Sequence, residues 1–313
     1  MLGYALRRIV GLIGVWFVAI VLTFVAVQFV PGDPIVAMLS DQSGDRALEA
    51  RLRAEYGLDR PLWVQFVDYL RNIANGSFGL SFRYAQTPVS EVIAGGLLIT
   101  PLLALVSISI AVMLGVLLGV FAAVRQNSWA DTAVILVLVT GISIPNFAMA
   151  AFLVYVFAIQ LGWLPVAGWG RLDQMLLPVA ILVIPPTAYI ARLTRTYMLE
   201  VLSRDYIRTA RAKGLRQRLV IYRHALRNTL VPLLTTVGII FGGLLSGTFV
   251  VETIFNIPGL GRMAIESIFA RDYPVTMTIV LLFTVFYSLI NLIVDLAYAA
   301  LDPRIRLGQE RGT

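Results

Sequence analysis

The sequence contains no cysteine and only one histidine, His224. The absence of cysteine excludes a disulfide framework, a thiolate nucleophile and a zinc–thiolate site, and one histidine cannot supply a zinc motif that needs a histidine pair. Lys213 is the single lysine among 25 basic residues. A P-loop places glycine directly before its lysine and serine or threonine directly after it, whereas Ala212 precedes Lys213 and Gly214 follows it. The chain therefore has no P-loop of its own.

Charged residues are also scarce, at 14% of 313 residues, while hydrophobic residues make up 58%. Soluble domains contain roughly 25% charged and about 45–50% apolar residues. A soluble core of this length cannot bury so much apolar surface, so a lipid bilayer must act as part of the solvent. The composition therefore argues against a soluble enzyme, a disordered protein and a coiled coil.

Six apolar segments are candidates for membrane spans, since about 20 helical residues cross the hydrocarbon core. These segments are 9–30, 97–124, 132–159, 175–191, 230–251 and 275–301. The fourth is the shortest and contains Pro178, Pro185 and Pro186, so we expect a kinked span packed inside the bundle. The sequence predicts an all-α membrane protein, which we divide into a first segment with its span over 1–30, a region outside the membrane over 31–96, a core over 97–301 and a tail over 302–313.

The distribution of basic residues predicts the orientation of these spans. Six spans place both termini on one side, and that side receives 16 of the 25 basic residues. Ten of them lie in the connection 192–229, which contains only two acidic residues. Because short cytoplasmic loops carry the excess of Lys and Arg in membrane proteins, we predict that both termini are cytoplasmic. These basic residues lie beside predicted membrane spans, which argues against nucleic-acid binding.

The region 31–96 has a balanced charge, with six basic and eight acidic residues, and we expect it to be folded. Hydrophobic residues at i, i+3, i+4 and i+7 from Trp63 to Leu70 predict an amphipathic helix. A shorter pattern from Leu48 predicts a second helix that ends at Gly57.

The basic connection 192–229 also contains the signature of a short capped helix. Asp205 is a good N-cap residue and Gly214 is a good C′ residue, with room for about two turns between them. Tyr206, Ile207 and Ala210 form its apolar side. Because so short a helix is marginal alone, we expect it to dock on something. The alternative is a positively charged loop that serves only membrane topology.

Polar residues within the last predicted span allow two interpretations. Asn291 and Asp295 lie at i and i+4, on one face of a helix. An intramembrane carboxylate can belong to an ion or proton path. The interpretation that we favour is interhelical hydrogen bonding near the inner end of the span, where charges reach the interface.

Two further groups are candidates for a path or a gate. Pro145 interrupts the third span, and Ser143 and Asn146 beside it supply polar groups that could line a substrate path or simply pack against a neighbouring helix. Glu252 lies at the outer end of the fifth span, before a turn rich in glycine. This turn could form a gate at the mouth of a pore or an ordinary loop.

Several motifs along nearly the whole chain resemble those of permease subunits of dipeptide, oligopeptide and nickel ABC importers. They are the arginine pair 7–8, FVPGDP at 29–34, YGLDRP at 56–61, GSFG at 76–79, DYIRTARAKG at 205–214, HALRN at 224–228 with Pro232, VETIFNIPGLG at 251–261, RDYP at 271–274 and the segment 291–304.

The resemblance implies that the short helix is the coupling helix of the EAA loop, which inserts into a groove on a cytoplasmic ATPase. Its residues would be Asp205, Tyr206, Ile207, Arg208, Thr209, Ala210, Arg211, Ala212, Lys213 and Gly214. The chain departs from the general pattern, because Arg208, Thr209 and Ala210 stand in place of Glu-Ala-Ala, while the final glycine is kept.

The same resemblance implies the type I permease fold in a bacterial inner membrane and a role as half of a translocation path for small peptides or related solutes. The implied partners are a second homologous permease, two ATPase subunits that carry ATP and Mg²⁺, and a solute-binding protein facing residues 31–96. The chain itself would be no enzyme, with no catalytic residue, cofactor or metal. The alternative function is an ion-coupled secondary transporter in which Asp295 carries the proton.

Overall fold

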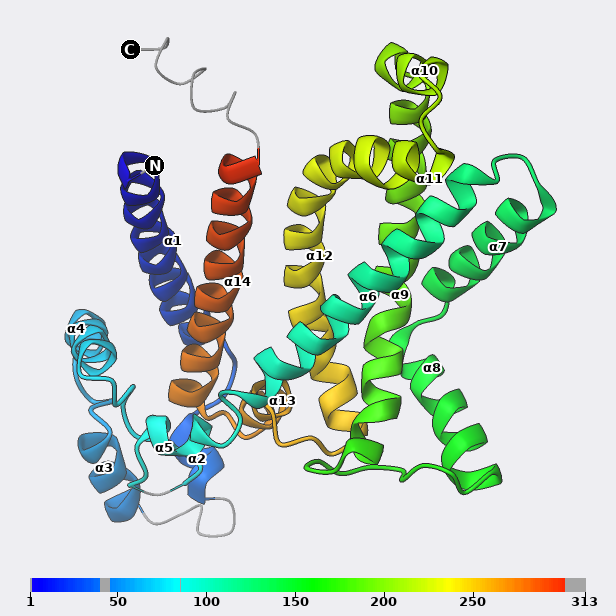
Figure 1. The fold of residues 1–313 in the computed structure, drawn as a ribbon. Coiled ribbons are helices and arrows are strands. Elements are labelled where there is room, and N and C mark those ends of the chain that lie inside the picture. Colours follow the sequence, from blue (N-terminus) through cyan, green and yellow to red (C-terminus); the bar gives the residue numbers. More distant parts are fainter. Residues whose placement is uncertain (1, 40–45, 85, 302–313) are drawn as a thin grey trace. The chain divides into compact units, whose positions relative to one another are not determined.

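The computed structural model describes residues 2–39, 46–84 and 86–301, so the predicted tail 302–313 lies outside the described residues (Figure 1). The described residues form helices, with a single isolated β-bridge between Leu80 and Pro88. The chain divides into two compact units. Unit 1 comprises Met1–Pro101 and Pro258–Ser288, and unit 2 comprises Leu102–Ile257 and Leu289–Thr313.

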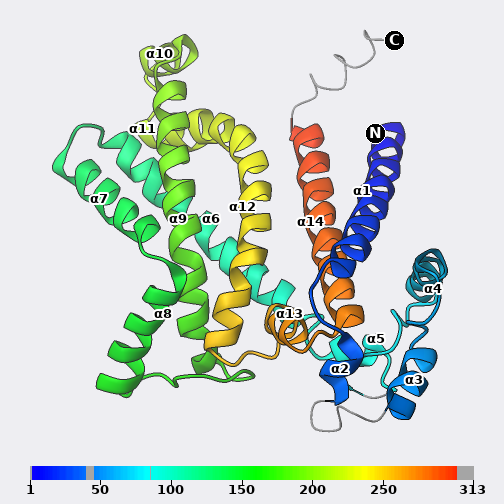
Figure 2. The ribbon, with the colours of Figure 1, turned by 180° about the vertical axis from the view of Figure 1, so that it is seen from behind.

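Unit 1 is built around two long helices, and short helices accompany them. Its elements are α1 (Leu2–Gln28), α2 (Pro34–Leu39), α3 (Arg46–Glu55), α4 (Leu62–Ala74), α5 (Val89–Ala94), α13 (Leu260–Phe269) and the first part of α14 (Tyr273–Leu301). Figures 1 and 2 both show α1 and α14 side by side. The indole Nε1 of Trp16 donates a hydrogen bond of 2.7 Å to Ser288 Oγ, which joins these two apolar helices.

The predicted amphipathic helix of the region 31–96 is confirmed as α4, but its buried face is rotated from the predicted one. Trp63 is 71% exposed, whereas Tyr69 is buried with Phe66 packed beside it against α1 and α14. Phe24 of α1 contacts the Phe66 ring edge-on, with centroids 5.2 Å apart. The shorter predicted helix is α3, and the chain turns after it at Gly57, whose φ is +67°.

Unit 2 contains the remaining helices, grouped around one long helix, α9. Its elements are most of α6 (Ile99–Val124), α7 (Trp129–Ser143), α8 (Asn146–Leu153), the π-helix η2 (Val154–Gln160), α9 (Leu172–Leu202), α10 (Asp205–Ala212), α11 (Gln217–Leu219), the π-helix η3 (Val220–Leu226) and α12 (Arg227–Ile254). α9 packs most extensively against α12 and α7. α6 approaches α9 closely at Gly119, where a Cβ would lie 2.5 Å from the carbonyl oxygen of Ala191.

The third predicted span, 132–159, is not one straight helix. α7 ends at Ser143, α8 begins at Asn146, and the two parts meet at a bend of 102°. Proline disfavours the helical conformation in the residue before it, and Ile144 is extended accordingly, with φ −90° and ψ 120°. The break predicted at Pro145 is therefore confirmed, and the single span is corrected to a bent pair.

The fourth predicted span is much longer than expected. The sequence predicted a segment over 175–191, whereas α9 has 31 residues and carries all three prolines inside it. The segment 192–229 is largely helical and not an irregular loop. Its first eleven residues belong to α9 and most of the rest to α10, α11, η3 and α12. Among the residues that the structure describes, five helices are long and apolar enough to cross a membrane, and the bent pair raises this number to six if it counts as one span.

Candidate functional site

The short basic helix predicted between two spans exists as α10, of eight residues. The N-cap residue is Arg204 and not Asp205, which is the first helical residue. Lys213 is the C-cap, and Gly214 follows it with φ +74°, as predicted for a C′ glycine. No heavy atom lies within 4 Å of the position of a Cβ on Gly214, so the backbone conformation alone favours glycine there.

The apolar face of α10 is covered by the chain's own helices. Ile207 is fully buried and Ala210 is 7% exposed, in a cluster with Met198 of α9, Val120 of α6 and Ile221 of η3. The predicted apolar side of α10 therefore docks, at Ile207 and Ala210, on the chain's own helices. Hydrophobic burial fixes this two-turn helix, which has little stability of its own, to the end of unit 2.

The opposite face of α10 is polar, cationic and available to a partner. Arg208, Thr209, Arg211 and Lys213 are all exposed. The guanidinium of Arg208 lies 3.6 Å from the Asp205 carboxylate, and both groups face solvent, so this ion pair contributes little stability. The exposed surface of α10 therefore consists mainly of cationic side chains and helix backbone.

Two polar contacts join this end of unit 2 to the neighbouring helices. Asn228 Nδ2 of α12 donates a hydrogen bond of 2.9 Å to Tyr206 Oη of α10. The Arg195 guanidinium of α9 donates two hydrogen bonds of 2.7 Å to the two oxygens of Asp131 in α7. Asp131 also accepts from the backbone N–H of Asn127 and its side chain is only 4% exposed. A bidentate ion pair therefore joins α9 to α7.

A groove of about 520 Å³ lies in unit 2 along α9 and α12. It is mostly apolar, and a few polar groups point to it, among them Asn146 of α8, Tyr189 of α9 and Thr236 of α12. Gly243 and Gly247 of α12 also line it, and no side chain fills the space beside Gly243. An apolar groove with few polar groups and open small-residue positions suits an amphipathic ligand of modest size.

The structure separates the predicted path and gate residues. Only Asn146 lines the groove. Ser143 and Pro145 are exposed at the break, where Ser143 Oγ donates to the carbonyl oxygen of Val139. Glu252 is fully buried near the end of α12, and its carbonyl oxygen accepts from the backbone N–H of Ile257.

The two polar residues of the last predicted span are both on α14. The amide oxygen of Asn291 lies 3.4 Å from the position that a Cβ on Gly238 would occupy, which places Asn291 against α12. Asp295 is partly buried one turn further along the helix. Packing between helices thus accounts for Asn291, while the role of Asp295 stays a prediction.

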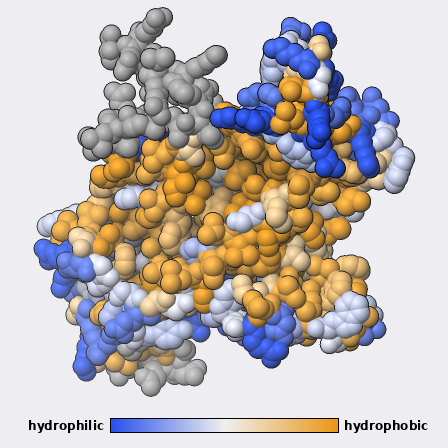
Figure 3. Space-filling model, viewed as in Figure 1, coloured by the Kyte–Doolittle hydropathy of each residue, from blue (hydrophilic) through white to orange (hydrophobic). Residues whose placement is uncertain are grey.

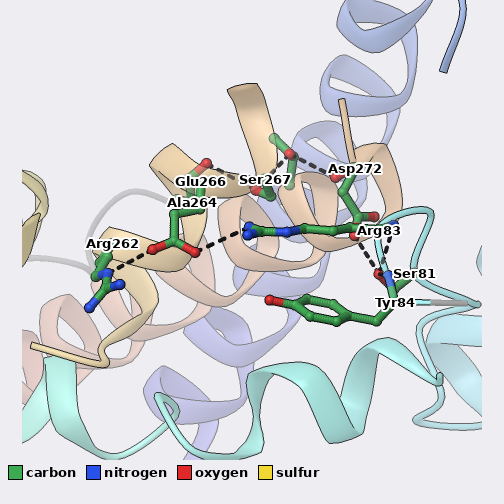
Figure 4. Close-up of polar contacts among 9 residues, drawn as sticks. Ser81, Arg83, Tyr84, Arg262, Ala264, Glu266, Ser267 and Asp272 are labelled. Carbon is green, nitrogen blue, oxygen red and sulfur yellow. Dashed lines mark hydrogen bonds and ion pairs between the residues drawn. The ribbon is translucent and has the colours of Figure 1, made fainter. Parts of the chain in front are cut away.

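A second cleft, of about 510 Å³, lies in unit 1 and was not foreseen in the sequence (Figure 4). Glu266 of α13 bridges two arginines, with Arg262 Nε donating to one carboxylate oxygen at 2.7 Å and Arg83 to the other at 3.2 Å. Burial would raise the pKa of the Glu266 carboxyl, but the ion pairs with Arg262 and Arg83 outweigh it and hold the pKa below its ordinary value.

Beside that cleft, a buried carboxylate joins the region 31–96 to α14. Asp272 is 1% exposed and accepts hydrogen bonds from Ser81 Oγ and from the backbone N–H groups of Phe82 and Arg83. Ser81 and Asp272 are separated by 191 positions, so no local pattern could have paired them. The motif RDYP at 271–274 was the only signal that pointed to this region.

Long apolar helices, a helix capped for docking and an apolar groove together define a membrane transport component. The chain belongs to the family described as binding-protein-dependent transport system inner membrane component, whose model matches residues 115–307. The model for the N-terminal part of such membrane components matches residues 1–93. The protein is therefore the permease component of a binding-protein-dependent ABC importer in an inner membrane, and it works with an ATPase and a substrate-binding protein.

Relatives with assigned transport roles match over almost the full chain. Glutathione transport system permease protein GsiC of Shigella flexneri serotype 5b is 42% identical over 306 residues, which is 98% of this chain and 99% of the relative. GsiC of Escherichia coli strain K12 is likewise 42% identical, and GsiC of Salmonella typhimurium is 43% identical, with the same coverage.

Solved structures confirm the type I permease fold. An inward-facing structure of the MetNI methionine ABC transporter matches with a TM-score of 0.59 and 18% identity, over 67% of this chain and 96% of that chain. An amino acid ABC transporter solved with histidines matches with a TM-score of 0.51 and 18% identity, over 74% of this chain and 98% of that chain.

Proposed function

We propose that this permease forms half of a translocation path for small peptides such as glutathione or related solutes. The groove beside Asn146, Tyr189 and Gly243 is the observation that supports this function. Its apolar walls and few polar groups fit a short peptide, which presents both amide groups and side chains. The relatives with glutathione in their names suggest the substrate class.

Half of a path needs a second surface to complete it. A second homologous permease is the partner that we propose for this role. Two ATPase subunits, which bind ATP and Mg²⁺, would contact the exposed face of α10, and a solute-binding protein would dock on the region 31–96 and the cleft near Glu266. We expect this chain itself to bind neither nucleotide nor metal, and to catalyse no covalent step.

α9 provides the mechanical connection between the two functional parts of unit 2. Its 31 residues correspond to about 46 Å of helix. Tyr189 of α9 lines the groove, and Met198 near its end packs against the docked α10. Closure of the ATPases would therefore displace α10 and, through α9, the wall of the groove. Such a change gives two states that differ in their contacts with the ATPases.

The proposed orientation places α10 and both termini in the cytoplasm and α3 outside. Single-cysteine labelling suits a chain without cysteine. Arg51 and Gln217 are both exposed, so a cysteine at either position is accessible to a reagent on its own side of the membrane. We expect an impermeant reagent added outside intact cells to label Arg51→Cys and not Gln217→Cys. Labelling at 217 from outside would contradict the orientation.

The path itself is tested by filling the groove. Gly243→Leu introduces a side chain into the groove at a position where the Cβ meets no heavy atom within 4 Å. We expect ATP-driven glutathione uptake into reconstituted vesicles to fall at least tenfold, while the complex still elutes intact from gel filtration. Gly14→Leu on α1 is the matched control, because its Cβ also meets no atom within 4 Å. Unchanged uptake with Gly243→Leu, or equal loss with Gly14→Leu, would contradict the proposed path.

A further inference from the structure

The segment after the coupling helix carries cations without partners. Between Asp205 and Glu252 the sequence contains no acidic residue. Four arginines of this stretch, Arg216, Arg218, Arg223 and Arg227, form what we name the basic rim, and all four are exposed. Among the residues that the structure describes, none of these guanidinium groups has an ion pair or a hydrogen bond. Other arginines of the chain, such as Arg195 and Arg262, do pair with carboxylates.

The same segment exposes apolar side chains in a stripe. Leu215, Leu219 and Tyr222, at i, i+4 and i+7, are 36%, 37% and 56% exposed. On the opposite side of the segment, Val220 and Ile221 are buried against the chain's own core. One face is therefore fixed to unit 2, and the other presents an apolar stripe with arginines on both of its edges.

The course of the chain brings this face to the end of unit 2, where the spanning helix α12 begins. Figure 1 shows that the helix continuing from α11 runs across the end of unit 2 before α12 turns along the other helices, and Pro232 lies inside α12. Figure 3 shows hydrophilic residues gathered at this end of unit 2, next to the hydrophobic surface of its spans. Helices with an apolar stripe edged by cations lie in the interface, where arginines reach the headgroups.

We propose that the basic rim and the apolar stripe form a binding surface for anionic phospholipid of the surrounding membrane. The guanidinium groups would pair with lipid phosphates, and Leu219 and Tyr222 would enter the boundary between headgroups and acyl chains. Lipid is a better occupant than the ATPase, because this segment is continuous with the spanning helix α12 whereas α10 projects beyond it (Figure 1). The preference for lipid over the ATPase rests on the proposed docking of the ATPase at α10. The rest of the inference does not depend on that docking.

The test compares lipid retention by the assembled transporter in nanodiscs. In mixtures of phosphatidylcholine and phosphatidylglycerol, we expect the transporter to retain phosphatidylglycerol preferentially, and added salt to lower the preference. Each arginine removed from the rim should weaken the preference about fivefold, so Arg216→Gln/Arg223→Gln should weaken it about 30-fold. The matched control is Arg46→Gln/Arg51→Gln on α3, whose arginines are also exposed. The control should keep the preference.

Three outcomes would overturn the proposal. The first is no preference of the unmodified transporter for phosphatidylglycerol at any salt concentration, a result that does not depend on the folding of a variant. The second is a loss of preference in the control as large as that in the rim variant. Loss of the ATPase from the rim variant in pure phosphatidylcholine, with lipid preference unchanged, would assign the arginines to the ATPase instead. A failure of glutathione uptake alone would contradict the proposed function and leave lipid binding unaffected.

Discussion

Replacing Ile207 by alanine separates the docking of α10 from its contact with a partner. Ile207 is fully buried in the cluster formed with Met198 and Ile221. The substitution removes three carbon atoms, which corresponds to about 2.4 kcal/mol of transfer free energy at about 0.8 kcal/mol for each. The cavity left behind brings the expected loss to about 2–5 kcal/mol. Because α10 has only eight residues, this loss should appear as undocking of α10 and not as unfolding of the chain.

Hydrogen exchange in the assembled transporter measures this undocking directly. A loss of about 2 kcal/mol corresponds to protection of the α10 amides lower by about 30-fold. The spans should keep their protection, while ATP hydrolysis should no longer respond to solute-loaded binding protein. Arg211→Ala is the control on the exposed face, where it should leave exchange of α10 unchanged and weaken only the association with the ATPase. Unchanged exchange and unchanged stimulation in Ile207→Ala would refute the argument that packing on unit 2 fixes the coupling helix.

Three further predictions concern Gly214, the ion pair between Asp131 and Arg195, and Asp295. Gly214→Val should lower stimulated ATP hydrolysis several-fold, because a β-branched residue at φ +74° is strained by about 1 kcal/mol or more. Gly214→Asn should have a milder effect, because asparagine tolerates positive φ better. Equal ATP hydrolysis by the two variants would contradict a conformational cause. Asp131→Asn and Arg195→Gln should each lower the stability of the detergent-solubilised complex by about 2–4 kcal/mol. A double-mutant cycle of thermal unfolding should give a coupling energy above about 1 kcal/mol. Additive effects would mean that the ion pair does not couple α9 to α7. Asp295→Asn should leave uptake ATP-dependent and insensitive to a proton uncoupler, and loss of uptake with normal ATP hydrolysis would support a proton path.

The sequence predicted the elements that depend on local chemistry. Apolar runs identified the spans, the capped stretch after α9 identified α10, and Pro145 identified the break in the third span. The length of α9 was missed because Arg192 and Arg195 were taken to belong to a connection between spans, whereas the helix continues to Leu202 and buries Thr194 and Met198 within unit 2. The sequence pattern of α10 shows that Ile207 belongs to a buried face. It does not show which helices cover that face.

The unforeseen cleft of unit 1 depends on pairings that no local pattern contains. Glu266 binds Arg83, which lies 183 positions earlier in the chain, and Asp272 binds the loop that contains Ser81. The residues themselves are ordinary charged and polar side chains. Only the fold brings them together, so sequence reasoning without the structure could assign the region to an outer surface but could not build its site.

The two-segment composition of unit 1 has a consequence for biosynthesis. The first segment ends at Pro101, and the chain must complete residues 102–257 before the second segment appears. Until α14 is synthesised, α4 lacks part of the surface that covers Tyr69, and the loop at Ser81 lacks the carboxylate of Asp272. During synthesis the N-terminal part therefore has an incompletely packed core. In this state it is open to proteolysis and to packing against the wrong helices. Truncation or stalling before Asp272 should consequently prevent the first hundred residues from completing their core, even though the spanning helix α1 has already been made.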